Sequence, residues 1–297
     1  MADENTIAIA KIGVIGAGKM GGGIAQLCAG RGHKVALADL SDDILARTMD
    51  AMTGALDRQV ARERLHADEA KSLIANIVTG TDYGMFSDCD LVIEAALEDE
   101  AVKSGVYAKL DAVLTDNALI ASNTSSLSIA RLAAASGRPD RFMGMHFFNP
   151  VPVMALVELI RGEATADSTF DAVRNLALAL GKTPIEAGDS PGFIVNRILM
   201  PLINEAAFAL HDGTGSVAAI DEAMRLGASH PMGPLELADY VGLDVCLAVI
   251  QVLHADFGDD KYRPCPLLQE LVAAGKLGRK SGSGFYDYSG DTPVPAR

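Results

Sequence analysis

A glycine-rich segment near the start of the chain constrains the fold more than any other feature. Residues 16–21 have the pattern GxGxxG and directly follow the apolar run at 11–15. In this pattern Gly16 makes a tight turn, Gly18 lets the backbone approach a pyrophosphate, and Gly21 lets a helix pack closely on a strand. The N–H groups and positive dipole end of a helix beginning here would face the phosphates. The segment predicts a dinucleotide-binding loop.

An acidic residue favours this interpretation over an ordinary glycine turn. Asp39 lies about 20 residues beyond the glycines and ends the apolar run at 34–39, where its carboxylate would accept hydrogen bonds from ribose hydroxyls. A carboxylate at this place repels the 2′-phosphate of NADP, so NAD is predicted and NADP is disfavoured. Lys19 and Met20 lie within the loop and are predicted to contact the cofactor.

Short β-branched apolar runs alternate with longer helical segments over the first 150 residues, a pattern typical of a parallel sheet covered by helices. The expected strands span residues 11–15, 34–39, 90–95 and 118–122. A helix at 167–180 and a strand at 182–187 should follow, with Gly181 as the helix C-cap. Pro150 and Pro152 exclude a continuous helix between these parts.

The rest of the chain is mostly helical in pattern. Ser190 and Pro191 predict a helix N-cap and first helical position, followed by one apolar face made by Ile194, Ile198, Leu202 and Ala206. Two more helices are expected, from Ser216 to near Gly227 and across 235–254. The predicted fold is an α/β Rossmann-type dinucleotide-binding domain, residues 1–187, followed by an all-α C-terminal domain, residues 188–297.

Charge and cysteine usage limit the partners and the compartment. The 297 residues include 25 Lys and Arg and 39 Asp and Glu, a formal net charge of −14. This excess of acid argues against nucleic-acid or anionic-membrane partners, which basic patches recruit. The four cysteines show no metal-ligand spacing and are expected to be reduced thiols in a cytoplasmic protein, with no metal bound. The acidic start and the absence of a long apolar run predict neither export nor a membrane span.

Two polar residues within apolar runs are candidates for proton transfer. His146 ends the run RFMGMHFF, and Glu158 lies in ALVELI, where an unpaired carboxylate would be costly to bury. The intervening Asn149-Pro150-Val151-Pro152 segment can reverse the chain, so the two side chains could meet. A carboxylate that holds one imidazole nitrogen leaves the other to exchange a proton with substrate. A structural histidine is the alternative.

Two further polar positions stand in apolar surroundings. Ser125 belongs to the sequence Asn-Thr-Ser-Ser after a predicted strand, and Asn196 lies in the predicted amphipathic helix. Helix capping by the serines and an internal hydrogen bond of Asn196 are as consistent with the sequence as a role in binding substrate.

Along nearly its whole length the chain resembles the (S)-3-hydroxyacyl-CoA dehydrogenases, most of all their short-chain bacterial members that act on 3-hydroxybutyryl-CoA. The resemblance is carried by the segments GAGKMGGGIA, SNTSSLSI, MHFFNPVPVMALVELI, DSPGFIVNRILMPLINEA, LGASHPMGPLELADYVGLD and GRKSGSGFYDY. It implies NAD-dependent interconversion of 3-hydroxyacyl-CoA and 3-oxoacyl-CoA thioesters, and a homodimer. The alternatives are a dehydrogenase of another hydroxy acid and a non-catalytic dinucleotide-binding relative.

The resemblance also implies roles for individual residues. His146 falls on the family's catalytic histidine and Glu158 on its partner, while Ser125 and Asn196 fall on residues that position the thioester substrate. Contacts on the nicotinamide side are implied for Glu98, Lys103, Asn123 and Asn149. The family often has lysines that meet the phosphates of coenzyme A after the second strand. This chain has Arg58 and Arg62 there, interleaved with acidic residues, so a solvated helix face is the alternative.

Overall fold

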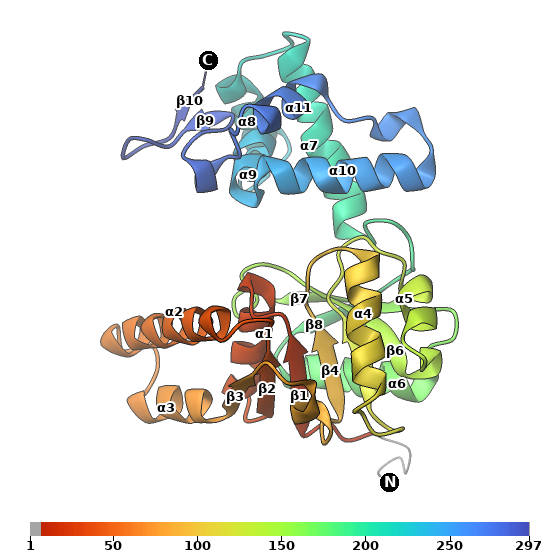
Figure 1. Cartoon of the computed structure of the whole chain (residues 1–297). Coiled ribbons are helices and arrows are strands. Elements are labelled where there is room, and N and C mark those ends of the chain that lie inside the picture. The colour runs from red at the N-terminus through yellow and green to blue at the C-terminus, as the bar shows by residue number, and fades with distance from the viewer. Residues whose placement is uncertain (1–6, 297) are drawn as a thin grey trace. The chain divides into compact units, whose positions relative to one another are not determined.

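The structure is a computed structural model that describes residues 7–296. The chain folds into two compact units, with the division between Ser190 and Pro191. Figure 1 shows a strand-rich first unit and a helical second unit. The division falls a few residues beyond Ala187, where the sequence predicts the domain boundary.

The first unit is built on an eight-stranded sheet with the order β3-β2-β1-β4-β5-β6-β7-β8. Strands β1 to β6 run parallel, β7 pairs antiparallel with β6, and β8 pairs parallel with β7. The strands are β1 Lys11–Ile15, β2 Lys34–Ala38, β3 Ile77–Gly80, β4 Leu91–Glu94, β5 Leu119–Ser122, β6 Phe142–Phe147, β7 Leu156–Arg161 and β8 Thr183–Ala187. All five strands predicted from the sequence are confirmed, whereas β3, β6 and β7 are not among the predicted strands.

Helices cover both faces of this sheet (Figure 1). They are α1 Lys19–Gly30, α2 Asp42–Ala61, α3 Ala67–Ala75, α4 Glu100–Asp111, α5 Ile129–Ala135 and α6 Asp167–Ala179, with 3-10 turns η1 Tyr83–Phe86 and η2 Pro139–Arg141. Alternate strand residues such as Ile12 and Val14 share one core with the buried faces of α1 and α6. Against the other face, Tyr107 of α4 packs edge-on to Phe142 of β6, with ring centroids 5.2 Å apart.

The parallel strands bring the polar segments of the sequence to one edge of the sheet. The glycine loop follows β1, Asp39 follows β2, Glu98 follows β4, and Asn123 follows β5. Strand β1 lies between β2 and β4, so the chain adds β2 and β3 on one side of β1 and then returns to add β4 on the other side. Such a switch point, at the carboxyl ends of the strands, is where open α/β sheets bind ligands.

The second unit contains α7 Val195–His211, α8 Val217–Gly227, α9 Pro234–Val241, α10 Leu243–Phe257 and α11 Pro266–Ala273, with 3-10 turns η3 Asp260–Tyr262 and η4 Arg279–Ser281. The helix expected to start at Pro191 begins at Val195, because Gly192 and Phe193 have φ angles of +74° and +50°. Its predicted apolar face is also wrong in part. Ile194 and Ile198 are exposed, and Met200, Ile203 and Ala207 form the buried face instead.

The single helix expected across 235–254 is two helices. Gly242 has a φ of +109° and separates α9 from α10, which meet at a bend of 99°. The unit is helical but also carries a two-stranded ladder of β9 Tyr286–Asp287 and β10 Val294–Pro295, so the all-α expectation missed this hairpin. Among residues 7–296 no single helix is long and apolar enough to cross a membrane; only α9 and α10 taken together reach that length and composition.

Candidate active site

The three glycines of the loop after β1 differ in what surrounds them. At Gly16, which has a φ of +93°, a Cβ atom would lie 2.5 Å from the carbonyl oxygen of Ala95, and at Gly21 it would lie 1.7 Å from that of Gly16. At Gly18 a Cβ atom would meet nothing within 4 Å. Close packing therefore requires Gly16 and Gly21, whereas Gly18 leaves an open backbone face.

This open face adjoins the start of α1. Gly18 is the N-cap of the helix and supplies no side-chain hydrogen bond to its first turn. An anion such as a pyrophosphate is the natural acceptor for amides at such a helix start. The residues present therefore fit the phosphates of a dinucleotide.

Asp39 holds this loop from the end of β2. Its Oδ2 atom accepts a hydrogen bond from the Ala17 amide at 2.6 Å, and its Oδ1 atom accepts one from the Leu40 amide at 2.7 Å. The hydroxyl of Thr48 on α2 donates to the Ala17 carbonyl at 2.6 Å. Each carboxylate oxygen can accept a further hydrogen bond, so these contacts leave Asp39 able to bind a ribose hydroxyl.

A cavity of about 530 Å³ lies beside the glycine loop, between α1, α2 and the segment that follows β6. Gly18, Lys19 and Asn149, which the sequence analysis assigns to cofactor contacts, line it, and so do Arg47 and Gln59, which are not among the predicted residues. Met20 is half-buried at the start of α1. The cavity therefore joins the nucleotide loop to a basic side chain of α2.

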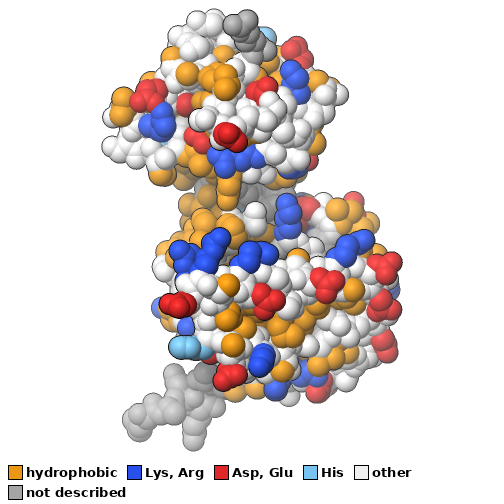
Figure 2. All heavy atoms as spheres, turned by 90° about the vertical axis from the view of Figure 1, so that its left-hand side faces the viewer, with side chains coloured by type: hydrophobic (Ala, Val, Ile, Leu, Met, Phe, Trp, Pro, Cys, Tyr) orange, Lys and Arg blue, Asp and Glu red, His pale blue; other side chains and the backbone are white. Residues whose placement is uncertain are grey.

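The predicted coenzyme A arginines are exposed near the end of α2. Arg58 lies in its last turn and Arg62 is its C-cap residue. Neither lines the cavity beside the glycine loop. Figure 2 shows basic side chains gathered along the upper rim of this unit.

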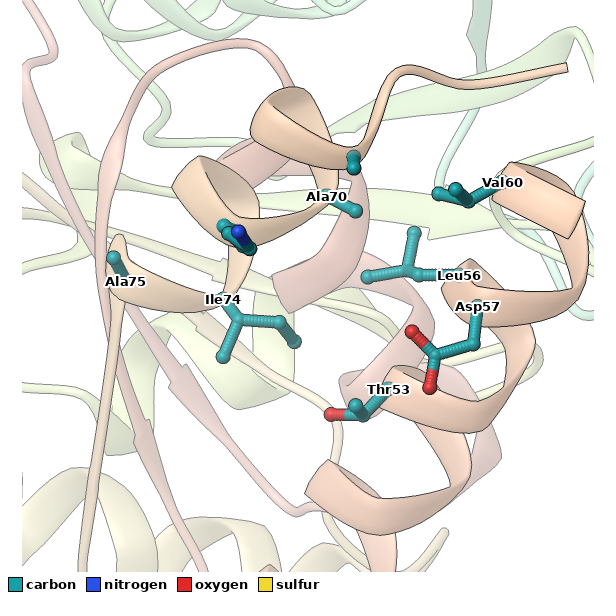
Figure 3. Close-up of a pocket in the computed structure, with 9 residues that line it drawn as sticks. Thr53, Leu56, Asp57, Val60, Ala70, Ile74 and Ala75 are labelled. Carbon is teal, nitrogen blue, oxygen red and sulfur yellow. The ribbon is translucent and has the colours of Figure 1, made fainter. Parts of the chain in front are cut away.

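A second cavity, of about 360 Å³, separates α2 from α3 (Figure 3). Leu56 and Val60 on α2 face Ala70 and Ile74 on α3, so the lining is mainly apolar. It contains none of the predicted site residues. We therefore place no catalytic chemistry in this cavity.

Strand pairing brings His146 and Glu158 together. They are direct partners in the antiparallel register of β6 and β7, and the Nδ1 atom of His146 lies 2.7 Å from the Oε2 atom of Glu158. Between the strands the chain reverses in a turn in which the amides of Val153 and Met154 donate to the Pro150 carbonyl. The Asn149–Pro150 peptide bond in this connection is cis.

This contact fixes the chemistry available to the histidine. Both side chains are buried, and Glu158 is only 1% exposed. An ionised carboxylate only accepts hydrogen bonds, so Nδ1–H of His146 donates to it and Nε2 is the nitrogen suited to proton exchange with a substrate. The Phe148 ring packs at 4.5 Å from the imidazole, measured between centroids. A histidine held by a carboxylate in this way can act as a general acid–base.

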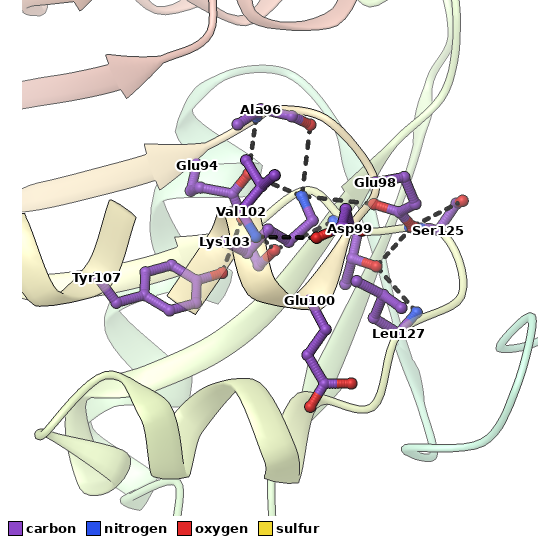
Figure 4. Close-up of polar contacts among 12 residues, drawn as sticks. Glu94, Ala96, Glu98, Asp99, Glu100, Val102, Lys103, Tyr107, Ser125 and Leu127 are labelled. Atoms are coloured by element: carbon purple, nitrogen blue, oxygen red, sulfur yellow. Dashed lines mark hydrogen bonds and ion pairs between the residues drawn. The ribbon is translucent and has the colours of Figure 1, made fainter. Parts of the chain in front are cut away.

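Glu98 organises the serine-containing turn after β5 (Figure 4). Its Oε1 atom is within hydrogen-bond distance of five donors, namely the Thr124 hydroxyl and the amides and hydroxyls of Ser125 and Ser126. Burial acts to raise the pKa of Glu98, but Lys103 and the hydrogen bonds from Thr124 and Ser125 outweigh it, and the pKa lies below its ordinary value. Glu98 is therefore an anion that holds Ser125.

Lys103, predicted as a cofactor contact, is a buried residue. Its side chain is 1% exposed, and its ammonium lies 2.7 Å from Glu94 Oε1 and 3.4 Å from Glu98 Oε2. Glu94 was missed by the sequence reasoning. The available signal was a carboxylate at the end of the otherwise apolar strand LVIE, since a buried carboxylate requires partners.

The asparagines among the predicted site residues differ in setting. Asn123 accepts a hydrogen bond from the Phe147 amide at 2.9 Å and so ties the end of β5 to β6. Asn149 is exposed. Asn196 belongs to the second unit, where it is the second residue of α7 and half-buried. Within residues 7–296 no three His, Cys, Asp or Glu side chains gather as a metal site would require.

Comparison with known families agrees with this geometry. The model of the family "3-hydroxyacyl-CoA dehydrogenase, NAD binding domain" matches residues 11–190, and that of its C-terminal domain matches residues 192–288. The chain belongs to the 3-hydroxyacyl-CoA dehydrogenase family. The family resemblance read from the sequence is thereby confirmed, as are the Rossmann-type first domain and the helical second one.

Individual members of the dehydrogenase family match over almost the full chain. The 3-hydroxybutyryl-CoA dehydrogenase of Bradyrhizobium diazoefficiens is 54% identical over 97% of this chain and 99% of its own length. Human mitochondrial hydroxyacyl-coenzyme A dehydrogenase is 43% identical over 97% of this chain and 94% of its own. The crystal structure of (S)-3-hydroxybutyryl-CoA dehydrogenase from Ralstonia eutropha superposes with a TM-score of 0.92, at 51% identity, and covers 95% of this chain and 100% of its own. This member of the dehydrogenase family is an NAD-dependent oxidoreductase.

Proposed function

We propose that the protein interconverts (S)-3-hydroxybutyryl-CoA and acetoacetyl-CoA, or thioesters of similar short chain length, with NAD as the cofactor. The observation that carries the proposal is the buried contact of 2.7 Å between His146 and Glu158 on paired strands. The names of the bacterial relatives support the short chain length. The open backbone at Gly18 and the carboxylate of Asp39 support NAD.

In this mechanism His146 is the acid and base. NADH, when bound, supplies the hydride that reduces C3 of the thioester. Protonated His146 gives its Nε2 proton to the C3 oxygen during reduction, and the neutral imidazole takes that proton back during oxidation. Glu158 stabilises the imidazolium and keeps Nδ1 as a donor.

Other residues bind and orient the two ligands. Ser125 and Asn196 hydrogen-bond the reacting oxygens of the substrate and so direct C3 toward the nicotinamide. The glycine loop, with Lys19 and Met20, binds the pyrophosphate side of NAD, and Asp39 binds its adenosine ribose. Glu98, Asn123 and Asn149 serve the nicotinamide side. Lys103 serves it through Glu98, because its ammonium is buried.

The coenzyme A part of the substrate needs cations in an acidic protein. We assign its phosphates to Arg58 and Arg62, which are exposed near the end of α2. Guanidinium groups bind phosphates through paired hydrogen bonds. Arg47 lines the neighbouring cavity and is a further candidate.

A homodimer in the cytoplasm is the setting we propose. The second unit exposes several large apolar side chains, among them Ile198, Leu226 and Val245. Exposed apolar surface of this kind is typical of subunit contacts. The four cysteines are buried free thiols, consistent with a reducing compartment. Light scattering of the purified protein should give twice the chain mass, and a monomer mass would contradict the dimer.

Steady-state assays test the proposed reaction. NADH oxidation should be fast with acetoacetyl-CoA, slower with longer 3-oxoacyl-CoA thioesters or with NADPH, and negligible with free acetoacetate. His146→Gln should lower turnover by at least ~10²-fold while NADH still binds, because a general acid–base contributes about that much. Turnover of the variant near the wild-type rate would refute the role of His146, and equal rates with acetoacetate would refute the thioester substrate.

A further inference from the structure

A buried carboxylate that the proposed mechanism does not use lies behind the site. Glu94 ends β4 and is fully buried. Its Oε1 atom accepts hydrogen bonds from the Lys103 ammonium and the Ala96 amide, and its Oε2 atom accepts them from the hydroxyls of Tyr107 and Ser122, all at 2.7 Å (Figure 4). Four short bonds satisfy the carboxylate, so Glu94 itself contacts no ligand.

The partners of Glu94 fix its role as an acceptor. Burial, followed by the nearby charge of Glu94, raises the pKa of Tyr107, so the phenol stays protonated and donates. The Ser122 hydroxyl, at the end of the neighbouring strand β5, donates as well. Glu94 is therefore held from a helix and from the strand that leads into the serine-containing turn.

Lys103 links this buried group to the site. An ammonium has three donors, and Lys103 has three acceptors in reach: Glu94, Glu98 and, at 3.5 Å, the Ala96 carbonyl. Burying an ion pair costs desolvation energy that the attraction of the charges often only offsets, so fold stability alone is a weak explanation for it. The ion pair with Glu94 does, however, fix the ammonium of Lys103 beside Glu98.

Glu98, held by Lys103, in turn fixes the position of Ser125. Because a carboxylate only accepts, the Ser125 hydroxyl donates its proton to Glu98 Oε1, across 3.1 Å, while the Ser125 amide donates to the same atom across 2.7 Å. The longer contact is the one that a substrate oxygen can replace at least cost. The backbone of Ser125 is thus held firmly and its hydroxyl loosely.

We propose that Glu94 is a positioning residue for the substrate serine, acting through Lys103 and Glu98 to hold the Ser125 turn in place. The inference rests on the proposed contact of Ser125 with substrate. Glu94 is buried and contacts no ligand, yet in this proposal it helps to orient the substrate for hydride transfer. Misplacement of a reacting group by about 1 Å can cost ~10²-fold in rate, so a modest shift of this turn is measurable.

A double-mutant cycle tests the proposal. Glu94→Gln keeps the shape of the side chain and removes its charge. We expect it to lower kcat/KM for acetoacetyl-CoA roughly tenfold when Ser125 is present, and by less than about threefold in the Ser125→Ala background. The same factor in both backgrounds would overturn the inference while leaving the role of Ser125 intact. A Ser125→Ala enzyme with wild-type kcat/KM would refute the proposed role of Ser125, and the inference with it.

Two further variants keep the test decisive. Tyr107→Phe removes one of the four hydrogen bonds to Glu94 and keeps the ring, so it replaces Glu94→Gln in the cycle if that variant fails to fold, with a smaller loss and the same dependence on Ser125. Asp90→Asn is the matched control at the opposite end of β4, where Oδ2 accepts from the Ala10 and Lys11 amides. It should lower the melting temperature and leave kcat/KM unchanged. A loss of kcat/KM in this control that depends on Ser125 would overturn the inference.

Discussion

Replacing Glu158 by Gln isolates the charge of the carboxylate that holds His146. The amide oxygen of the variant still accepts from Nδ1–H, but the negative charge 2.7 Å away is gone. A hydrogen bond to a charged group contributes about 1.5–3 kcal/mol, and both side chains are buried, so little solvent screening reduces this value here. At 1.36 kcal/mol for each factor of ten, turnover in the direction of oxidation, in which the imidazolium forms, should fall roughly 10- to 150-fold.

The same energy should move the pH–rate profile in a defined direction. In the proposed mechanism, reduction of the 3-oxo group requires protonated His146, so the rate of reduction falls as pH rises and the imidazolium is lost. Without the anion the imidazolium is less stable and is lost at lower pH. The alkaline limb of the profile for reduction should therefore move to lower pH.

Measurements of kcat for the oxidation of 3-hydroxybutyryl-CoA with NAD check the turnover, and measurements of kcat for acetoacetyl-CoA and NADH across the neutral and alkaline range check the profile. Glu186→Gln, on the adjacent strand β8, is the matched control, since its carboxylate is 60% exposed and pairs with Arg161. That control should leave both the rate and the profile unchanged. An alkaline limb of Glu158→Gln that coincides with the wild-type limb would refute the reasoning, even if turnover fell.

Three other predictions follow from the nucleotide loop and its neighbours. Gly21→Ala should lower the melting temperature, because the added Cβ atom would collide with the Gly16 carbonyl. Gly18→Ala should fold normally and lose affinity for NADH in a fluorescence titration. Equal effects of the two substitutions would contradict the roles assigned to these glycines. Asp39→Ser should raise the Kd for NADH roughly tenfold. It should also reduce the preference of the enzyme for NADH over NADPH, measured as the ratio of the kcat/KM values with the two cofactors. Glu98→Gln should lower the free energy of unfolding near neutral pH. Because folding lowers the pKa of Glu98, its charged carboxylate contributes fully to the free energy of unfolding above about pH 4.3, and this contribution is lost as the pH falls below that value. In denaturant titrations the difference in stability between the variant and the wild type should therefore shrink on acidification.

Local sequence patterns predict the sheet of the first unit well. Its central strands are buried on both faces and therefore appear as apolar runs bounded by glycine or polar residues. Strand β3 escapes because it lies at the edge, where only Ile77 is buried. The break between α9 and α10 is not predicted from the sequence for a different reason. A glycine such as Gly242 is tolerated inside helical sequences, and only its positive φ in the folded chain marks the break.

The candidate site is predictable where a polar side chain interrupts an apolar run. His146 and Glu158 are of this kind, and the prolines between them indicate a reversal of the chain. The buried position of Lys103 is not predictable, because its acceptor Glu94 comes from a strand and the pairing is set by packing of α4 on the sheet. Asn196 belongs to a separate unit, so a local pattern cannot relate it to the other residues.

The antiparallel pairing of β6 with β7 makes the contact between His146 and Glu158 depend on the number of residues in β7 ahead of Glu158. Side chains alternate between the faces of a strand, so a single-residue insertion in β7 ahead of Glu158 would turn its carboxylate to the opposite face of the sheet. An insertion in the connection at 148–155 is absorbed outside the ladder and leaves the partners opposite each other. The number of residues can therefore vary in the connection at 148–155 but not in the part of β7 ahead of Glu158.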